Sequence, residues 1–186
     1  MSLSDRKAGA GARLISAIMV AAALLAAGGC TVRPLYGDAG IAGGQGASAS
    51  LAAIEVKPVS TRQALEVRNH LIFLLSGGAG QPAAPTYVLE LSVTSATTAA
   101  ATVQVATDNE PSAGTVTVKA VYTLRDAGSG DFISSGTRST SASFDRLRQE
   151  FATMRAERDA ENRAARELAE LLRLAIVHDL EKQGAI

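Results

Sequence analysis

The hydrophobic positions fall into one uncharged run near the amino terminus and a longer region of alternating and helical patterns. The run LISAIMVAAALLAA occupies residues 14–27 and has no polar face. As a helix rising about 1.5 Å per residue it would extend about 21 Å, which is less than the roughly 30 Å hydrocarbon core of a bilayer. Basic residues precede it and small residues follow it, so residues 1–29 are predicted to be an export signal rather than a membrane span.

The first elements expected after this run are a short strand and a helix. Ile54 and Val56 alternate with charged residues until Pro58 interrupts the pattern, which favours a short edge strand. Thr61 is suited to cap a helix that reaches about Leu75. The apolar residues of this helix recur at spacings of three and four: Ala64, Val67, Leu71 and Leu74.

Three strands joined by turns are predicted next. The first begins at Tyr87 and keeps its apolar residues in odd positions to about Ala106. After a turn at residues 108–114, the clearest alternation of the chain runs over residues 115–124, with apolar residues at Val116, Val118, Ala120, Tyr122 and Leu124. The last strand, residues 132–144, has serine and threonine on both faces of its middle, which indicates a sheet edge or a surface for a partner.

A long carboxy-terminal helix completes the pattern. Asp145 is a candidate amino-terminal cap for it. An apolar stripe follows helical spacing through Leu147, Phe151, Met154, Ala165, Leu168, Leu172 and Ile176. The order β-α-β-β-β-α predicts an α+β fold over residues 51–186: a four-stranded, mostly antiparallel sheet with two helices packed on one face.

Composition and charge exclude several classes of protein. The 186 residues are 47% hydrophobic and include 18 basic and 18 acidic side chains. Neither a disordered chain nor a basic nucleic-acid-binding protein is therefore expected. Glycine, alanine and serine dominate residues 37–50, which predicts a flexible tether within a linking segment at residues 30–50.

The single cysteine lies where the predicted export signal meets this tether. The chain has no second cysteine with which it could form a disulfide. The segment LLAAGGCT, residues 24–31, resembles the lipobox of bacterial lipoproteins, in which the cysteine is acylated and becomes the first residue. The resemblance implies that Cys30 is lipidated and that several acyl chains anchor the protein in a membrane. Thr31 after the cysteine implies, by the same resemblance, sorting to the outer membrane on its periplasmic side.

Groups suited to catalysis or cofactor binding are sparse. His70 and His178 fall on two different predicted helices, and neither has a neighbouring histidine or cysteine to complete a metal site. The sequence contains no GxSxG nucleophile motif and no phosphate-binding loop ending in GKS or GKT. We therefore expect a protein that is not an enzyme and uses no cofactor, although a hydrolase that relies on a pair of carboxylates would leave no motif.

Several segments together resemble the LptE family of lipopolysaccharide-assembly lipoproteins. They are the lipobox followed by CTVRPLYG, the element order, YTLRD before a glycine-rich hairpin, and the last helix with its pairs Phe144–Asp145 and Phe151–Ala152. The resemblance implies a protein that plugs and supports an LptD-like outer-membrane β-barrel and helps lipopolysaccharide reach the cell surface. In such a role, Lys119, Arg125 and Arg138 are candidates to contact the phosphates of lipopolysaccharide.

Two other functions fit the sequence. An auxiliary lipoprotein of a lipid-trafficking ABC transporter would share the anchor and the small α/β domain. A periplasmic hydrolase would have to use carboxylates that no motif identifies. Co-purification with a barrel, co-purification with an inner-membrane ATPase, or a turnover lost on a single Asp or Glu substitution would separate the three.

Overall fold

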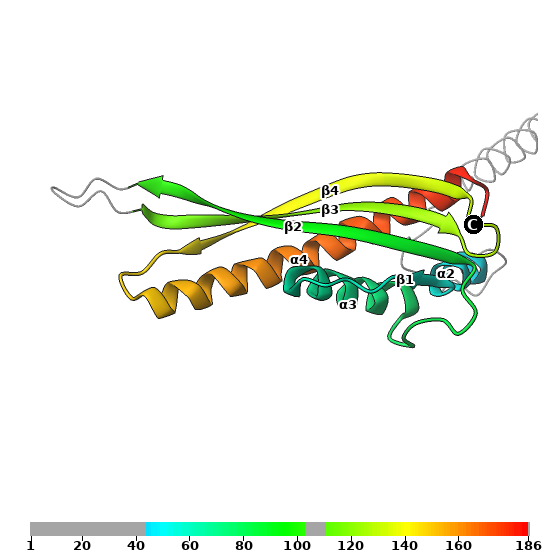
Figure 1. The fold of residues 1–186 in the computed structure, drawn as a ribbon, viewed down its shortest axis with the longest axis horizontal. Helices are drawn as coiled ribbons and strands as arrows, with labels where there is room; N and C mark the ends of the chain where they lie inside the picture. Colours follow the sequence, from blue (N-terminus) through cyan, green and yellow to red (C-terminus); the bar gives the residue numbers. More distant parts are fainter. Residues whose placement is uncertain (1–43, 103–110, 186) are drawn as a thin grey trace, which may run out of the picture. The chain divides into compact units, whose positions relative to one another are not determined.

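The computed structural model describes residues 44–102 and 111–185. The elements in chain order are α2 (Gly44–Ala52), β1 (Ile54–Val56), α3 (Arg62–Ser76), β2 (Tyr87–Thr102), β3 (Pro111–Asp126), β4 (Phe132–Asp145) and α4 (Glu150–Lys182). Figure 1 shows α3 and α4 on one side of the sheet. The predicted α+β class and the order β-α-β-β-β-α are confirmed, and α2 precedes that series.

The four strands form one mixed sheet in the order β1-β2-β3-β4. β1 pairs parallel with β2, with α3 as the crossover, and the other two pairings are antiparallel. Leu89 on β2 lies opposite Leu124 on β3, which lies opposite Ser134 on β4. Since opposite residues point to the same face, odd positions of β2 and even positions of β3 and β4 face the helices.

The core lies between this helix-side face and the two helices. The five β3 residues selected by their alternation are all buried: Val116, Val118, Ala120, Tyr122 and Leu124. Alanines make up much of the buried stripe of α4, at Ala160, Ala164, Ala165, Ala169 and Ala175. Small side chains on the helix let larger ones on the sheet fill the space between the layers, as close packing requires.

Of the side chains that the structure describes, Tyr122 is the largest that is fully buried, with 1% of its surface exposed. Its hydroxyl donates a hydrogen bond of 2.7 Å to Asp179 Oδ2 on α4. Gly136 lies opposite Tyr122 on β4, and a Cβ at that position would come within 2.8 Å of the tyrosine ring. The Tyr122 ring can therefore occupy this position only because residue 136 has no side chain.

Helix α3 follows the sequence prediction closely. Thr61 is its amino-terminal cap, and the threonine side chain accepts a hydrogen bond from the Ala64 backbone amide. Gly77 is the carboxy-terminal cap, and its φ of 61° is a left-handed conformation that glycine adopts without steric cost. One correction applies to its stripe: Leu75 is buried, whereas Leu74 is only partly buried.

The start of α4 differs from the prediction in two ways. Asp145 is the last residue of β4, and α4 begins at Glu150 with Gln149 as a cap that makes no side-chain hydrogen bond. The first three residues of the predicted apolar stripe are exposed, by 58%, 67% and 45% for Leu147, Phe151 and Met154. The stripe is buried only from Ala160 onward, because charged residues occupy the intervening turns of the helix.

Two loop predictions are also corrected. Residues 44–50, assigned to the flexible tether, belong to α2, whose Leu51 is buried and whose Ser50 hydroxyl donates a hydrogen bond to the Ala185 carbonyl. Pro111 lies in β3, paired with Thr102, so the strand begins inside the segment expected as a turn. The predicted continuation of β2 to Ala106 lies outside the described residues. Residues 44–102 and 111–185 contain no hydrophobic helix of membrane-spanning length.

Candidate functional site

The face of the sheet that points away from α3 and α4 is lined mainly by serine and threonine. Even positions of β2 and odd positions of β3 and β4 supply these side chains, in keeping with the register. We call the following set the hydroxyl face: Ser92, Thr94, Thr98, Thr115, Thr117, Thr123, Ser135, Thr137, Ser139, Ser141 and Ser143. Short polar side chains from three strands thus form one continuous surface that can donate and accept hydrogen bonds.

Few hydrogen bonds tie these hydroxyls to one another. The Thr115 and Ser143 hydroxyl oxygens lie 3.4 Å apart across β3 and β4. The Thr98 hydroxyl donates to the Thr115 carbonyl at 3.5 Å. Thr117, Ser139 and Ser141 are exposed at the centre of the face. Polar groups on this surface are therefore accessible to a partner or to water.

Charged side chains accompany the hydroxyls near the start of β2. Lys57 Nζ and Glu90 Oε1 form an ion pair of 2.6 Å. The hydrogen bond from the Lys57 ammonium holds the pKa of the Glu90 carboxyl below its ordinary value, and the charge of Lys57 acts in the same direction. Both side chains are about half exposed, so this pair contributes little to stability.

The three basic residues selected from the sequence do not lie together. Lys119 and Arg125 point outward among the hydroxyls, but they are six positions apart on β3, a separation of about 20 Å at the usual rise per residue. Arg138 lies opposite Ala120, on the helix-side face, and its guanidinium donates to the Thr137 carbonyl at 2.9 Å. Cys30 lies outside the described residues.

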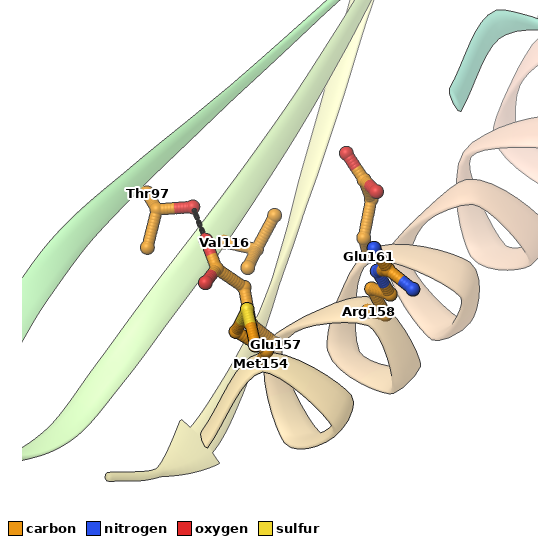
Figure 2. A pocket seen from close by; sticks show the side chains of 6 residues that line it. All are labelled: Thr97, Val116, Met154, Glu157, Arg158 and Glu161. Atoms are coloured by element: carbon orange, nitrogen blue, oxygen red, sulfur yellow. Dashed lines mark hydrogen bonds between the residues drawn. The ribbon is translucent and has the colours of Figure 1, made fainter. Parts of the chain in front are cut away.

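A pocket of about 260 Å³ opens between the sheet and the first turns of α4 (Figure 2). Its lining consists of Thr97, Val116, Met154, Glu157, Arg158 and Glu161. The Thr97 hydroxyl donates a hydrogen bond of 2.6 Å to Glu157 Oε1. If the buried apolar stripe of α4 extended to the start of the helix, it would contact the sheet at the position of this pocket.

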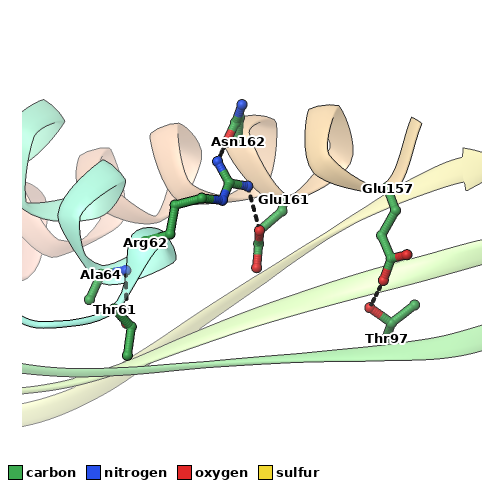
Figure 3. A network of polar contacts seen from close by, with 7 residues as sticks. All are labelled: Thr61, Arg62, Ala64, Thr97, Glu157, Glu161 and Asn162. Carbon is green, nitrogen blue, oxygen red and sulfur yellow. Dashed lines mark hydrogen bonds and ion pairs between the residues drawn. The ribbon is translucent and has the colours of Figure 1, made fainter. Parts of the chain in front are cut away.

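The second carboxylate of this pocket is held by the other helix. Figure 3 shows Arg62 at the start of α3 reaching α4, where its guanidinium contacts Glu161 Oε2 at 2.6 Å and Asn162 Oδ1 at 3.1 Å. Each carboxylate therefore has a partner, one from the sheet and one from α3. These contacts link the three elements around the pocket, and they do not assemble groups for acid–base catalysis.

The remaining titratable candidates also lie apart. His70 contacts Glu66 one helical turn away at 3.2 Å, with more than a third of its side chain exposed. His178 is exposed on α4. Among the residues that the structure describes, no group of three or more His, Cys, Asp or Glu side chains could hold a metal ion.

Sequence reasoning identified the serine-rich strand but missed the pocket. A detectable pattern existed for it: Arg158 and Glu161 lie seven residues before Ala165 and Leu168. Residues seven apart fall on nearly the same face of a helix. Arg158 and Glu161 therefore occupy the face of α4 that is apolar and buried further along the helix. Charged residues on that face indicate the turns at which α4 does not pack tightly against the sheet.

The structure defines a small α+β domain with an exposed polar face on the side of the sheet opposite its helices. Comparison with known protein families adds the particular class: residues 51–176 match the LptE family, described as lipopolysaccharide-assembly. The match covers more than half of the chain, and the chain belongs to the LptE family.

Solved structures of other bacterial lipoproteins share the fold. A putative lipoprotein from Caulobacter crescentus CB15 has 25% identity and a TM-score of 0.61, covering 75% of this chain and 98% of that one. A minor lipoprotein from Acinetobacter baumannii has 15% identity and a TM-score of 0.50, covering 68% and 89% of the two chains. Rare lipoprotein B from Shewanella oneidensis has 10% identity and a TM-score of 0.50, covering 70% and 96%. The last two show a shared fold alone. No curated protein matches the chain by sequence.

Proposed function

We propose that this protein is a lipid-anchored, non-enzymatic component of lipopolysaccharide assembly that plugs and supports an LptD-like β-barrel in the outer membrane. The observation behind the proposal is the hydroxyl face, an accessible polar surface on one side of a domain that belongs to the LptE family. Membership in the LptE family supports a role in lipopolysaccharide assembly, and the hydroxyl face supports docking inside a barrel.

The chemistry of the hydroxyl face suits the interior of a barrel. The lumen of an outer-membrane barrel is polar, so a plug must form hydrogen bonds rather than bury apolar surface. Serine and threonine lose less side-chain entropy on docking than lysine, glutamate or glutamine would. Thr117, Ser139 and Ser141 can each donate and accept, so they can adapt to polar groups of either kind.

The anchor would act by raising the local concentration of the domain. Acylation of Cys30, in the lipobox-like segment, would hold the domain at the periplasmic surface of the outer membrane. Tethering makes docking effectively intramolecular, so a modest intrinsic affinity would suffice.

Direct contact with lipopolysaccharide would involve separate basic residues rather than one cluster. Lys119 and Arg125 share the outward face, where their ammonium and guanidinium groups could each bind a phosphate. Arg138 faces the other way and would have to act independently. On this proposal, lipopolysaccharide contacts supplement a docking surface made mainly of hydroxyls.

The test is recovery of the barrel with a tagged, full-length protein from gently solubilised envelopes of its host. Thr117→Trp places a bulky ring at the centre of the hydroxyl face and should greatly reduce the amount of barrel recovered. Glu167→Trp, at an exposed position of α4, is the matched control and should leave recovery unchanged. Recovery of wild-type protein alone would contradict the proposal, and recovery of an inner-membrane ATPase instead would favour the transporter alternative.

A further inference from the structure

β4 forms an edge of the sheet over its 14 residues, Phe132–Asp145. The hydrogen-bond ladder shows which of its backbone groups point outward. The Leu89 carbonyl accepts from the Lys57 amide, so odd residues of β2 bond toward β1 and even residues bond toward β3. Alternation then directs odd residues of β3 toward β2 and even residues toward β4. By the same rule, even residues of β4 bond to β3 and odd residues point away from the sheet.

Two arginine contacts agree with this assignment. The Thr137 carbonyl accepts a hydrogen bond from Arg138 Nη1, and the Ser143 carbonyl accepts one from Arg163 Nη2, each at 2.9 Å. Both carbonyls belong to odd residues of β4. Guanidinium groups thus bind part of the outer edge, and both arginines are exposed, so a strand could replace these contacts without opening the core.

The composition of β4 does not protect it against strand pairing. Edge strands are commonly blocked by proline, lysine or a covering segment. The sequence FISSGTRSTSASFD contains neither proline nor lysine, and Arg138 is the single basic residue in it. The opposite edge is divided: β1 pairs only with residues 87–89 of β2 and the Lys57–Glu90 ion pair lies where β1 ends, whereas β4 offers 14 consecutive residues. β4 is therefore the edge better suited to strand addition.

The position of Arg138 indicates the kind of strand that fits. Arg138 lies near the middle of β4, so an antiparallel pairing of two copies with their helices on the same side and Phe132 opposite Phe144 would place Arg138 opposite Arg138. Like charges directly opposite each other destabilise a sheet. A strand with a carboxylate at that position would instead form a favourable pair.

We propose that β4 pairs with an extended segment of a partner protein that places an aspartate or glutamate opposite Arg138; identifying that partner as the barrel rests on the proposed function. The outward amides and carbonyls of residues such as Ser139 and Ser141 supply the ladder, and Arg138 fixes the register. Docking then involves the edge of the sheet as well as its hydroxyl face.

The test compares two changes at one outward-facing amide in the full-length, lipidated protein. Ser139→Pro removes the outward N–H and should spare the β3 ladder, since proline is tolerated on edge strands when its nitrogen faces solvent. Ser139→Ala, the matched control, also removes the hydroxyl but keeps the amide. We expect Ser139→Pro to reduce co-purified barrel at least about tenfold relative to Ser139→Ala, a difference of about 1.4 kcal/mol. Thermal unfolding of both variants verifies that they fold.

A charge change gives a second readout if the proline variant does not fold. Arg138→Glu should reduce barrel recovery and Arg138→Lys should preserve it. If wild type recovers the barrel, Ser139→Pro recovers as much of it as Ser139→Ala does, and Arg138→Glu recovers as much as wild type does, the edge inference is wrong and the proposed function stands.

If wild type recovers no barrel, the proposed function fails and the edge is tested by a photocrosslinker placed at Thr137 in native envelopes. An adduct mapped to an extended, carboxylate-containing segment of another protein supports the inference. An adduct to a second copy of this chain, or no adduct, overturns it.

Discussion

The hydrogen bond between Tyr122 and Asp179 allows a quantitative test of how the sheet is joined to α4. Tyr122→Phe removes the hydroxyl but keeps the ring, so the change in the free energy of unfolding includes no cost for a large empty cavity. Hydrogen bonds to charged groups contribute about 1.5–3 kcal/mol. Asp179 is only partly buried and can regain water when its donor is lost. We therefore expect a loss at the lower end of that range, about 1.5 kcal/mol.

The same bond predicts a dependence on pH. Burial of the ring, followed by the hydrogen bond to Asp179, raises the pKa of Tyr122 from 10.0 to about 12. The unfolded chain gives up this proton near pH 10, whereas the folded chain retains it. The contribution to stability is thus complete below the unfolded pKa of 10.0 and is lost as the pH rises toward the folded pKa of about 12.

Urea titrations followed by circular dichroism measure both effects. Wild type and Tyr122→Phe are compared at neutral pH and at about pH 11, which lies between the unfolded and folded pKa values. Because other groups titrate in both proteins, the difference between them isolates Tyr122, and that difference should shrink at the higher pH. Equal free energies of unfolding at neutral pH, or a difference that does not change with pH, would refute the assigned role of the bond.

Three further predictions concern single positions. Gly136→Ala should destabilise the fold by about 1–3 kcal/mol, because its Cβ would lie 2.8 Å from the Tyr122 ring; an unchanged urea midpoint would show that the ring moves without cost. Thr61→Ala should cost about 1 kcal/mol through loss of the α3 cap, whereas Thr61→Ser should retain most of it in the same titration. Cys30→Ser should abolish incorporation of a fatty-acid analogue during growth, and label retained by the variant would contradict the lipid anchor.

Patterns confined to one element predicted the fold well. The alternation at Val116, Val118 and Ala120 identified the buried face of β3 because strand geometry alone sends every second side chain to the same side. Thr61 identified the start of α3 because a cap acts within three residues. These features depend on local geometry, which the sequence specifies directly.

Features that depend on a partner surface were harder to predict. Leu147, Phe151 and Met154 continue the helical period of α4, but the period does not specify where tight packing against the sheet begins. The side of the sheet reached by Arg138 depends on the β3–β4 register, which includes an irregularity between Leu124 and Arg125. A shift of one residue moves every side chain to the other face, so placing Arg138 on the opposite face from Lys119 required information that the sequence alone did not contain.

Residues on the helix-side face of the sheet determine stability, whereas residues on the outward face are available for docking. Residues that hold the layers together, such as Leu124, Tyr122 and Gly136, lie at even positions of β3 and β4, and changes there alter the core. Thr117, Ser139 and Ser141 lie at odd positions and are exposed, so changes there should shift the free energy of unfolding by no more than about 0.5 kcal/mol. A loss of barrel recovery on changing an exposed odd position can therefore be attributed to docking, provided that the urea midpoint is unchanged.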